Sequence, residues 1–219
     1  MSSAEHLRLL ATRLAPADGI DRHDLELLTV PDTVAARSAE EICREAQSET
    51  LANHCFRSYA WGALLGNRDG LDWDPELLYV AAMLHDLGLT PAYDRGGCFE
   101  QDGADAAREL LAELGWEATR AETVAEAIYL HMHETGPENT PEAQLLDLGT
   151  AVDVRGVRIG DVPASPRSFV LDRFPRIGFK EHFLELLTDQ ADRKPQCIAH
   201  AFVYERHAAE HIRTAPFDS

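Results

Sequence analysis

The sequence predicts an all-α protein. Apolar residues recur at helical spacing along most of the 219 residues, and several of these segments start with a helix-capping residue. No alternating run of β-branched residues is long enough to form a sheet. With 45% hydrophobic and 26% charged residues, the chain can build one sizeable core, so we expect residues 1–219 to form a single domain.

The expected helices follow from this periodicity and from local start signals. Thr140 before a proline is a good start, and the string "TRAE" from Thr119 is typical of a capping box. Residues 90–102 are expected to form a glycine-containing loop, and residues 155–175 an irregular segment over one mouth of the fold. The helices are expected at residues 4–14, 32–66 with a break near Ser48, 74–88, 103–114, 119–133, 140–154, 178–192 and 196–213.

The helix at residues 74–88 has the clearest start, because Asp74 is a good N-cap and is followed by a proline. Residues 77–84 of this helix are apolar almost all round, which is typical of a helix surrounded by protein. His85 and Asp86 therefore lie at the buried end of a central helix. Burying such a pair costs several kcal/mol unless its charge is compensated, and a metal ion is the usual compensator.

Acidic residues outnumber basic ones, 38 Asp and Glu against 20 Lys and Arg, which gives a formal charge of -18. A protein with this charge repels phosphate backbones and anionic lipid surfaces, so nucleic acid is not an expected partner. No apolar stretch approaches the ~20 residues of a membrane span, and the N-terminal residues do not resemble a signal peptide. We expect a cytoplasmic protein that acts on a small molecule.

Four cysteines, Cys43, Cys55, Cys98 and Cys197, are scattered along the chain without a C-x-x-C spacing. This spacing indicates neither a zinc ribbon nor a disulfide framework. We expect all four to be reduced thiols.

Candidate metal ligands lie before and after the His-Asp pair. His54 precedes His85 by 31 residues, and Asp153 follows Asp86 by 67 residues. Imidazoles and carboxylates from separate helices suit a divalent metal such as Zn, Fe, Mn, Co or Ni.

This order of residues resembles the HD domain family of metal-dependent hydrolases, whose signature is H…HD…D on a helical bundle. The matching segments are "NHCFRSY", "AAMLHDLGL" and "AVDVRG". The resemblance implies an HD-domain helical bundle with its core motifs at about residues 50–156 and flanking helices at both ends. It also implies that His54, His85, Asp86 and Asp153 bind one divalent metal ion, with zinc or iron favoured.

Within this superfamily the sequence is most similar to the cyanamide hydratase-like branch. The segments that carry this similarity are "CFEQDGADAARELLAELGW", "VAEAIYLH" and "VDVRG". The resemblance implies a hydrolase or hydratase that activates water to act on a small C–N compound such as cyanamide or a nitrile.

Further side chains are candidates for the chemistry. Asp86 has a second oxygen that could accept a proton from water, and Glu100, on the expected loop, could shuttle a proton or orient the substrate. Arg57 follows His54 by three residues, on the same helical face, and could hold an anionic or polar substrate group.

Two histidines in "HMH" are separated by one residue, and on a straight helix such residues diverge by roughly 200°. His131 shares a helical face with Val124 and Ile128, so we expect it to point into the site, where it could act in catalysis or contact the substrate. His133 is then expected to point outward. This geometry favours one metal over two.

Three alternatives remain open. The protein could be an HD phosphohydrolase acting on a nucleotide or phosphomonoester, a dinuclear iron oxygenase that uses both His131 and His133, or a non-catalytic ligand-binding module. The few basic residues near the motifs favour a neutral or weakly charged substrate over phosphate. Exposure of the apolar group Phe183, Leu184, Leu186 and Leu187 would favour a homodimer.

Overall fold

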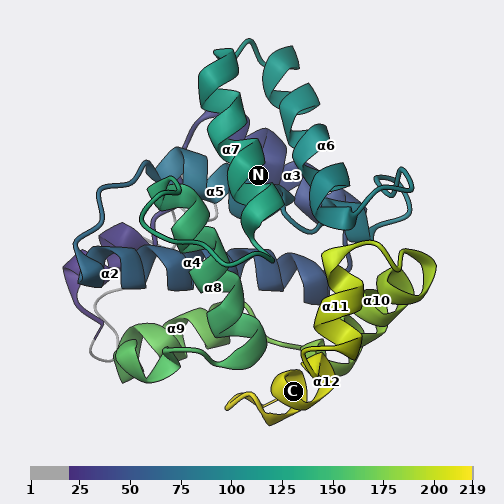
Figure 1. Ribbon diagram of the computed structural model, residues 1–219. Helices are drawn as coiled ribbons and strands as arrows, with labels where there is room; N and C mark the ends of the chain where they lie inside the picture. Colours follow the sequence, from purple (N-terminus) through teal and green to yellow (C-terminus); the bar gives the residue numbers. More distant parts are fainter. Residues whose placement is uncertain (1–19, 219) are drawn as a thin grey trace.

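The computed structural model describes residues 20–218, so the helix expected at residues 4–14 lies outside the described part. Residues 20–218 form α-helices and two 3-10 helices, with no strand among them (Figure 1). The all-α fold class is confirmed. The elements are α2 (Arg22–Leu27), α3 (Val34–Ala46), α4 (Glu49–Asp69), α5 (Pro75–Leu84), η1 (Leu87–Leu89), α6 (Phe99–Glu113), α7 (Ala118–Leu130), α8 (Pro141–Arg155), η2 (Ile159–Asp161), α9 (Ala164–Arg173), α10 (Phe179–Arg193), α11 (Ile198–Tyr204) and α12 (Ala208–Thr214).

Helix α5 lies at the centre of the core, and its start is the one that the sequence predicts. The Asp74 carboxylate accepts hydrogen bonds from the backbone N–H groups of Glu76 and Leu77. All residues from 77 to 84 are buried, and α5 packs against α3, α4, α7 and α8. The helix ends at Leu84, so the next two residues lie in the turn that leads to η1.

Helices α4 and α8 cross at very short range near the middle of the molecule (Figure 1). A Cβ atom on Gly149 of α8 would lie 2.1 Å from the backbone oxygen of Ser58 on α4. A Cβ atom on Gly62 of α4 would lie 2.7 Å from the backbone oxygen of Leu145 on α8. The two glycines therefore allow the backbones to touch, and this contact sets how closely side chains of α4 and α8 approach each other.

We expect the Gly149→Ala variant to be destabilised by about 1–3 kcal/mol, because the added methyl group would overlap a backbone atom that cannot move without shifting a helix. Gly160→Ala is the matched control, since no atom of residues 20–218, apart from its own chain neighbours, lies within 4 Å of its added methyl group. Chemical denaturation of both variants measures the difference. Equal stability of the two would mean that the crossing tolerates a wider spacing.

Helices α10, α11 and α12 form a group at the C-terminal end of the chain, which packs on α4, α8 and η1 (Figure 1). Phe183, Leu184 and Leu187 are buried in the apolar cluster between this group and the rest of the protein. Leu186 is half-buried against the same cluster, so these four residues belong to the core.

A disulfide joins Cys98, the residue before α6, to Cys197, the residue before α11. The expectation of four reduced thiols is wrong for this pair, while Cys43 and Cys55 are free and buried. The sequence could not indicate the bond because the two residues are 99 positions apart and only the fold brings them together. Nearby, Asp94 accepts hydrogen bonds from Arg193 and Lys194, so the loop before α6 is tied to α10 at a second point.

Some helix limits differ from the expected ones. Helix α6 begins at Phe99 rather than residue 103, and the acidic residues of its first turn suit the positive end of a helix dipole. The segment expected to be irregular contains α9, whose Val170 is buried in one apolar cluster with residues of α4 and α8. The last expected helix is divided into α11 and α12 because His207 has a left-handed φ of 54°.

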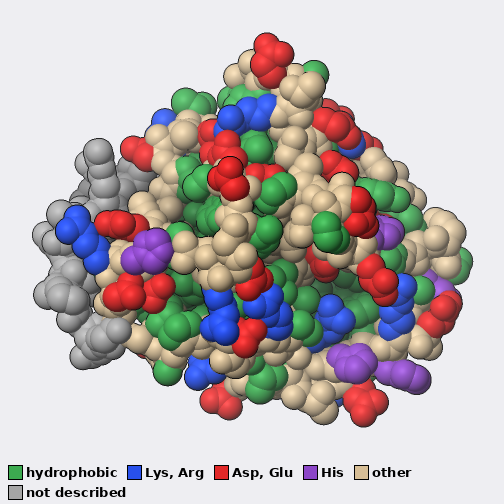
Figure 2. Space-filling model, turned by 60° about the vertical axis from the view of Figure 1, so that its left-hand side comes forward, with side chains coloured by type: hydrophobic (Ala, Val, Ile, Leu, Met, Phe, Trp, Pro, Cys, Tyr) green, Lys and Arg blue, Asp and Glu red, His purple; other side chains and the backbone are tan. Residues whose placement is uncertain are grey.

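Acidic side chains recur across the face drawn in Figure 2, as the formal charge of -18 requires. Lysine and arginine side chains gather in a band across the lower half of this face. Among the described residues, no helix is long and apolar enough to cross a membrane.

Candidate metal centre

Three side chains from neighbouring helices converge on one point. His54 lies on α4, and His85 and Asp86 directly follow α5. Nε2 of His85 lies 3.3 Å from Nε2 of His54 and 3.2 Å from Oδ2 of Asp86. Oδ2 of Asp86 lies 3.6 Å from Nε2 of His54, and all three residues are at most 1% exposed. These separations suit three atoms that share one ion at bond lengths of about 2.0–2.2 Å.

In the neutral form of each imidazole, the hydrogen bonds of Nδ1 leave the converging Nε2 atom free of a proton. Nδ1 of His85 lies 2.8 Å from the carbonyl oxygen of Ala82, and Nδ1 of His54 lies 2.8 Å from Oδ2 of Asp153. Carbonyl and carboxylate oxygens accept, so each Nδ1 carries the proton and donates it. The two Nε2 atoms then direct lone pairs toward each other, which is unfavourable unless a cation or a proton lies between them.

Asp86 adds a negative charge to this point. Neither of its carboxylate oxygens accepts a hydrogen bond from residues 20–218, although the side chain is buried. Burial raises the pKa of this carboxyl group, but His85, His54 and His131 outweigh that effect and lower the pKa to about 2. A buried carboxylate without hydrogen-bond donors, beside the Nε2 atoms of two imidazoles, needs a positive charge next to it, and a divalent cation supplies one. In the described part of the chain, His54, His85 and Asp86 form the group whose ligand atoms all lie within 4.8 Å of one another.

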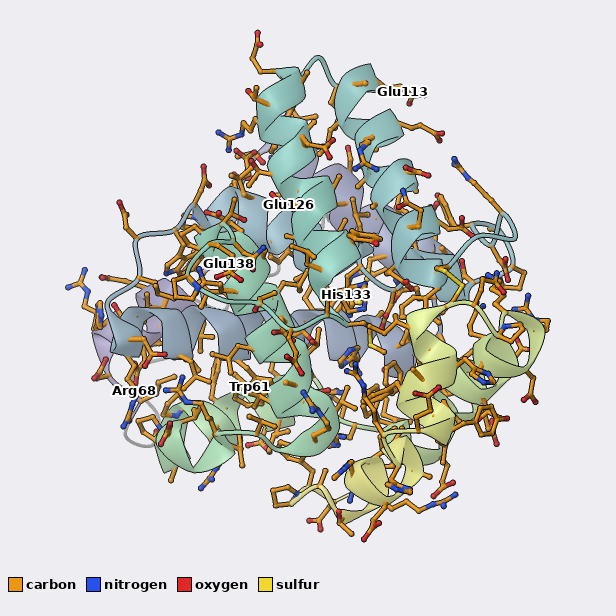
Figure 3. The ribbon with its side chains drawn as sticks, in the orientation of Figure 1. Trp61, Arg68, Glu113, Glu126, His133 and Glu138 are labelled. Atoms are coloured by element: carbon orange, nitrogen blue, oxygen red, sulfur yellow. A yellow bond between two sulfur atoms is a disulfide. The ribbon has the colours of Figure 1, made fainter. Side chains whose placement is uncertain are left out.

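Asp153, on α8, lies behind His54. Its carboxylate accepts hydrogen bonds from Nδ1 of His54 (2.8 Å), Nε and Nη2 of Arg57 (2.8 Å each), Nε1 of Trp61 (3.0 Å) and Nη1 of Arg176 (3.1 Å). Trp61 reaches it from α4, close to the crossing with α8 (Figure 3). Burial raises the pKa of Asp153, but Arg57, His54 and Arg176 together hold it well below its usual range.

The structure therefore brings three of the four expected ligands together and places Asp153 at the opposite edge of the His54 ring. In this position Asp153 fixes the orientation and the proton of His54. Direct coordination by Asp153, as the sequence predicts, would require its carboxylate to leave His54 and two arginines.

A cavity of about 230 Å³ borders the cluster. His54, His85, Asp86 and His131 form its buried side. The apolar part of its wall includes Met132, Val154, Phe183 and Phe202. Its exposed rim includes Glu134, Arg155, Arg206 and His211. The volume lies below the roughly 300–1,000 Å³ of sites for drug-sized ligands, so the cavity suits a small molecule.

Residues 51–153 match the family described as HD domain, and this range includes all four residues of the H…HD…D signature. The chain contains an HD domain. Over 171 residues it is also 28% identical to two proteins of Saccharomyces cerevisiae (strain ATCC 204508 / S288c), cyanamide hydratase DDI2 and cyanamide hydratase DDI3. Each match covers 75% of this chain and 76% of the relative, and it fits the cyanamide hydratase-like branch of HD proteins.

Within the HD domain, Arg57 does not reach the cavity. It is fully buried, pairs with Asp153 and donates through Nη1 to the backbone oxygens of Phe174 and Pro175. The expectation that it contacts the substrate is therefore corrected. Its spacing from His54 does place it on the same side of α4, but there it pairs with the carboxylate of Asp153 and not with a substrate.

Glu100 lies in the first turn of α6, not on a loop, and it is not part of the cavity lining. It is 2% exposed, its Oε2 atom has no hydrogen-bond partner in residues 20–218, and burial raises its pKa. The expectation that Glu100 shuttles a proton or orients the substrate is therefore not met by this geometry.

His131 and His133 both line the cavity of the HD domain. Nδ1 of His131 donates to the carbonyl oxygen of Ile128, which leaves Nε2 as an acceptor 3.8 Å from Oδ1 of Asp86. Burial and the neighbouring His85 lower the pKa of His131 to about 3. The expected outward direction of His133 is wrong because α7 ends at Leu130 and the straight-helix geometry no longer applies (Figure 3).

Several residues of the site could not be found from the sequence. Arg176 supports Asp153, and Arg206 and His211 line the cavity, yet all three lie beyond the HD match. Each is brought to the site by the packing of the C-terminal helices, and no spacing rule connects them to the HD motif.

Proposed function

We propose that this protein is a metal-dependent enzyme that adds water to a small molecule with a polarised C–N bond, of the cyanamide or nitrile kind. The observation that carries the proposal is the convergence of two Nε2 atoms and one carboxylate oxygen at the buried end of a small cavity. The HD domain and the two yeast relatives, which are described as cyanamide hydratases, support it. His54, His85 and Asp86 would hold the ion, with zinc or iron as the metal.

When bound, the ion supplies the nucleophile by lowering the pKa of a water from about 15.7 toward ~7. Oδ2 of Asp86 faces the two imidazoles, which leaves Oδ1 to accept the proton that the water loses. Nε2 of His131, 3.8 Å from Oδ1, can take up this proton from Oδ1 and pass it to the nitrogen of the C–N group. The oxygen of water then bonds to carbon and its two protons end on the product, so that R–C≡N and H₂O give R–CONH₂.

A second candidate, hydrolysis of a phosphomonoester, is favoured by one observation. Arg155 and Arg206 line the cavity, and guanidinium groups bind phosphate well. The scarcity of basic residues near the motifs in the sequence therefore does not extend to the cavity itself. The volume of about 230 Å³ favours a small phosphomonoester over a nucleotide.

Incubation of metal-loaded protein with cyanamide, simple nitriles and small phosphomonoesters separates the two candidates. We expect formation of urea from cyanamide, or of amides from nitriles, and its loss on chelation of the metal. Release of phosphate without any C–N hydration would contradict the proposal and support the second candidate.

A further inference from the structure

Most arginine side chains in residues 20–218 pair with a carboxylate, but a few do not. In this acidic protein most of them pair with a carboxylate within 4 Å. The exceptions within residues 20–218 are Arg155, Arg167, Arg173 and Arg206, whose side chains form no ion pair or hydrogen bond with other described residues. Two of these exceptions, Arg155 and Arg206, line the cavity.

Arg155 and Arg206 reach the cavity from different segments. Arg155 is the last residue of α8, and Arg206 lies in the turn between α11 and α12, followed by His211 on α12. All three are exposed, so they lie at the rim, whereas the metal-binding group lies at the buried side. An unpaired guanidinium keeps its donors free for a ligand, and two of them can bind one carboxylate or phosphate group from two directions.

Within the described part of the chain, no carboxylate of the cavity forms an ion pair with Arg155 or Arg206 within 4 Å. Asp147 accepts a hydrogen bond from the Thr135 hydroxyl at 2.8 Å. Burial raises the pKa of Asp147, and the nearby charge of Arg155 only partly offsets this rise. Glu134 is exposed and forms no ion pair with either arginine within the described part of the chain. The charge of Arg206 acts inside the cavity, where together with burial it lowers the pKa of His133.

We propose that Arg155 and Arg206 determine specificity by binding an anionic group of the substrate at the rim, while the opposite end of the substrate reaches the metal group. This inference rests on the proposed function and specifies its substrate class: a small molecule with one carboxylate or phosphate group, and an apolar middle that contacts Phe183 and Phe202. Cyanamide itself lacks the anionic group, so we expect it to be hydrated with a lower kcat/KM than a nitrile that carries one.

The first test measures binding without turnover. Isothermal titration of metal-loaded protein with succinate and with inorganic phosphate should show that Arg155→Gln and Arg206→Gln each weaken binding by about 10-fold. Arg167→Gln is the matched control, because Arg167 also forms no ion pair with residues 20–218 but lies outside the cavity. Equal binding by the unsubstituted protein and all three variants would overturn the proposal. Undetectable binding by the unsubstituted protein would also overturn it.

The second test measures turnover with a matched pair, cyanoacetate and its neutral amide cyanoacetamide. We expect kcat/KM to favour cyanoacetate by about 10-fold, through KM, and this preference to disappear in Arg155→Gln and Arg206→Gln. Arginine-dependent anion binding without any C–N hydration would refute the proposed function and leave the anion site in place. Hydration with no preference for cyanoacetate would refute the anion site alone. Arginine-dependent hydrolysis of a phosphomonoester would identify phosphate as the bound anion.

Discussion

Replacement of His85 by alanine is expected to remove the metal and abolish activity. His85 supplies one of the three converging atoms, and its Nε2 lies within 3.3 Å of both other ligand atoms. Loss of a residue that only supports a ligand typically costs about 10- to 100-fold in metal affinity, so loss of a ligand itself should cost more. Elemental analysis of untagged protein should fall from about one ion per chain to background, and the hydration rate should fall with it.

His207→Asn is the control for this variant. His207 is exposed, does not line the cavity, and has a left-handed φ that asparagine tolerates. It should keep both the metal and the activity. If His85→Ala kept a full complement of tightly bound metal, the ion would have to lie elsewhere and the proposed centre would be wrong.

Replacement of Asp153 by asparagine is expected to cost about 3–5 kcal/mol of stability, because it leaves Arg57 and Arg176 buried without their counter-charge. The same change removes the carboxylate that holds the proton of His54, so metal affinity should also fall by about 10- to 100-fold. Denaturation of the metal-free protein and titration with the metal measure the two effects separately.

Asp69→Asn provides the comparison. Asp69 also pairs with an arginine, Arg158, through two hydrogen bonds, but both side chains are about one-third exposed. Solvent screens such a pair, so its loss should cost less than about 1 kcal/mol. The Asp153→Asn variant also distinguishes a residue that supports His54 from a residue that binds the metal directly. Complete loss of metal with unchanged stability would show that Asp153 is a direct ligand, as the sequence predicts.

The start of α5 and the position of its buried His-Asp pair could be predicted because they depend on local chemistry. Asp74 caps the helix and the apolar residues after it exclude solvent, whatever the rest of the chain does. The direction of His133 could not be predicted, because it depends on α7 ending at Leu130, and nothing in "YLHMHE" stops a helix.

The roles of Arg57 and the two bonded cysteines depend on contacts between distant segments. The spacing of Arg57 from His54 gives its face of the helix, but not that Asp153 occupies that face. Cys98 and Cys197 are brought together by the packing of α10 and α11 against the loop before α6. Such pairings follow from the tertiary fold, and a single sequence contains no local sign of them.

The division of the site between two stretches of chain has a consequence for engineering. The three atoms that would hold the ion all belong to residues 51–153, whereas Arg155, Phe183, Phe202, Arg206 and His211 come later. A chimera that keeps the first stretch and takes its C-terminal helices from a relative should retain the reaction and acquire the substrate preference of that relative. Because Cys98 and Cys197 lie on opposite sides of this junction, a productive exchange would have to preserve both partners of the bond.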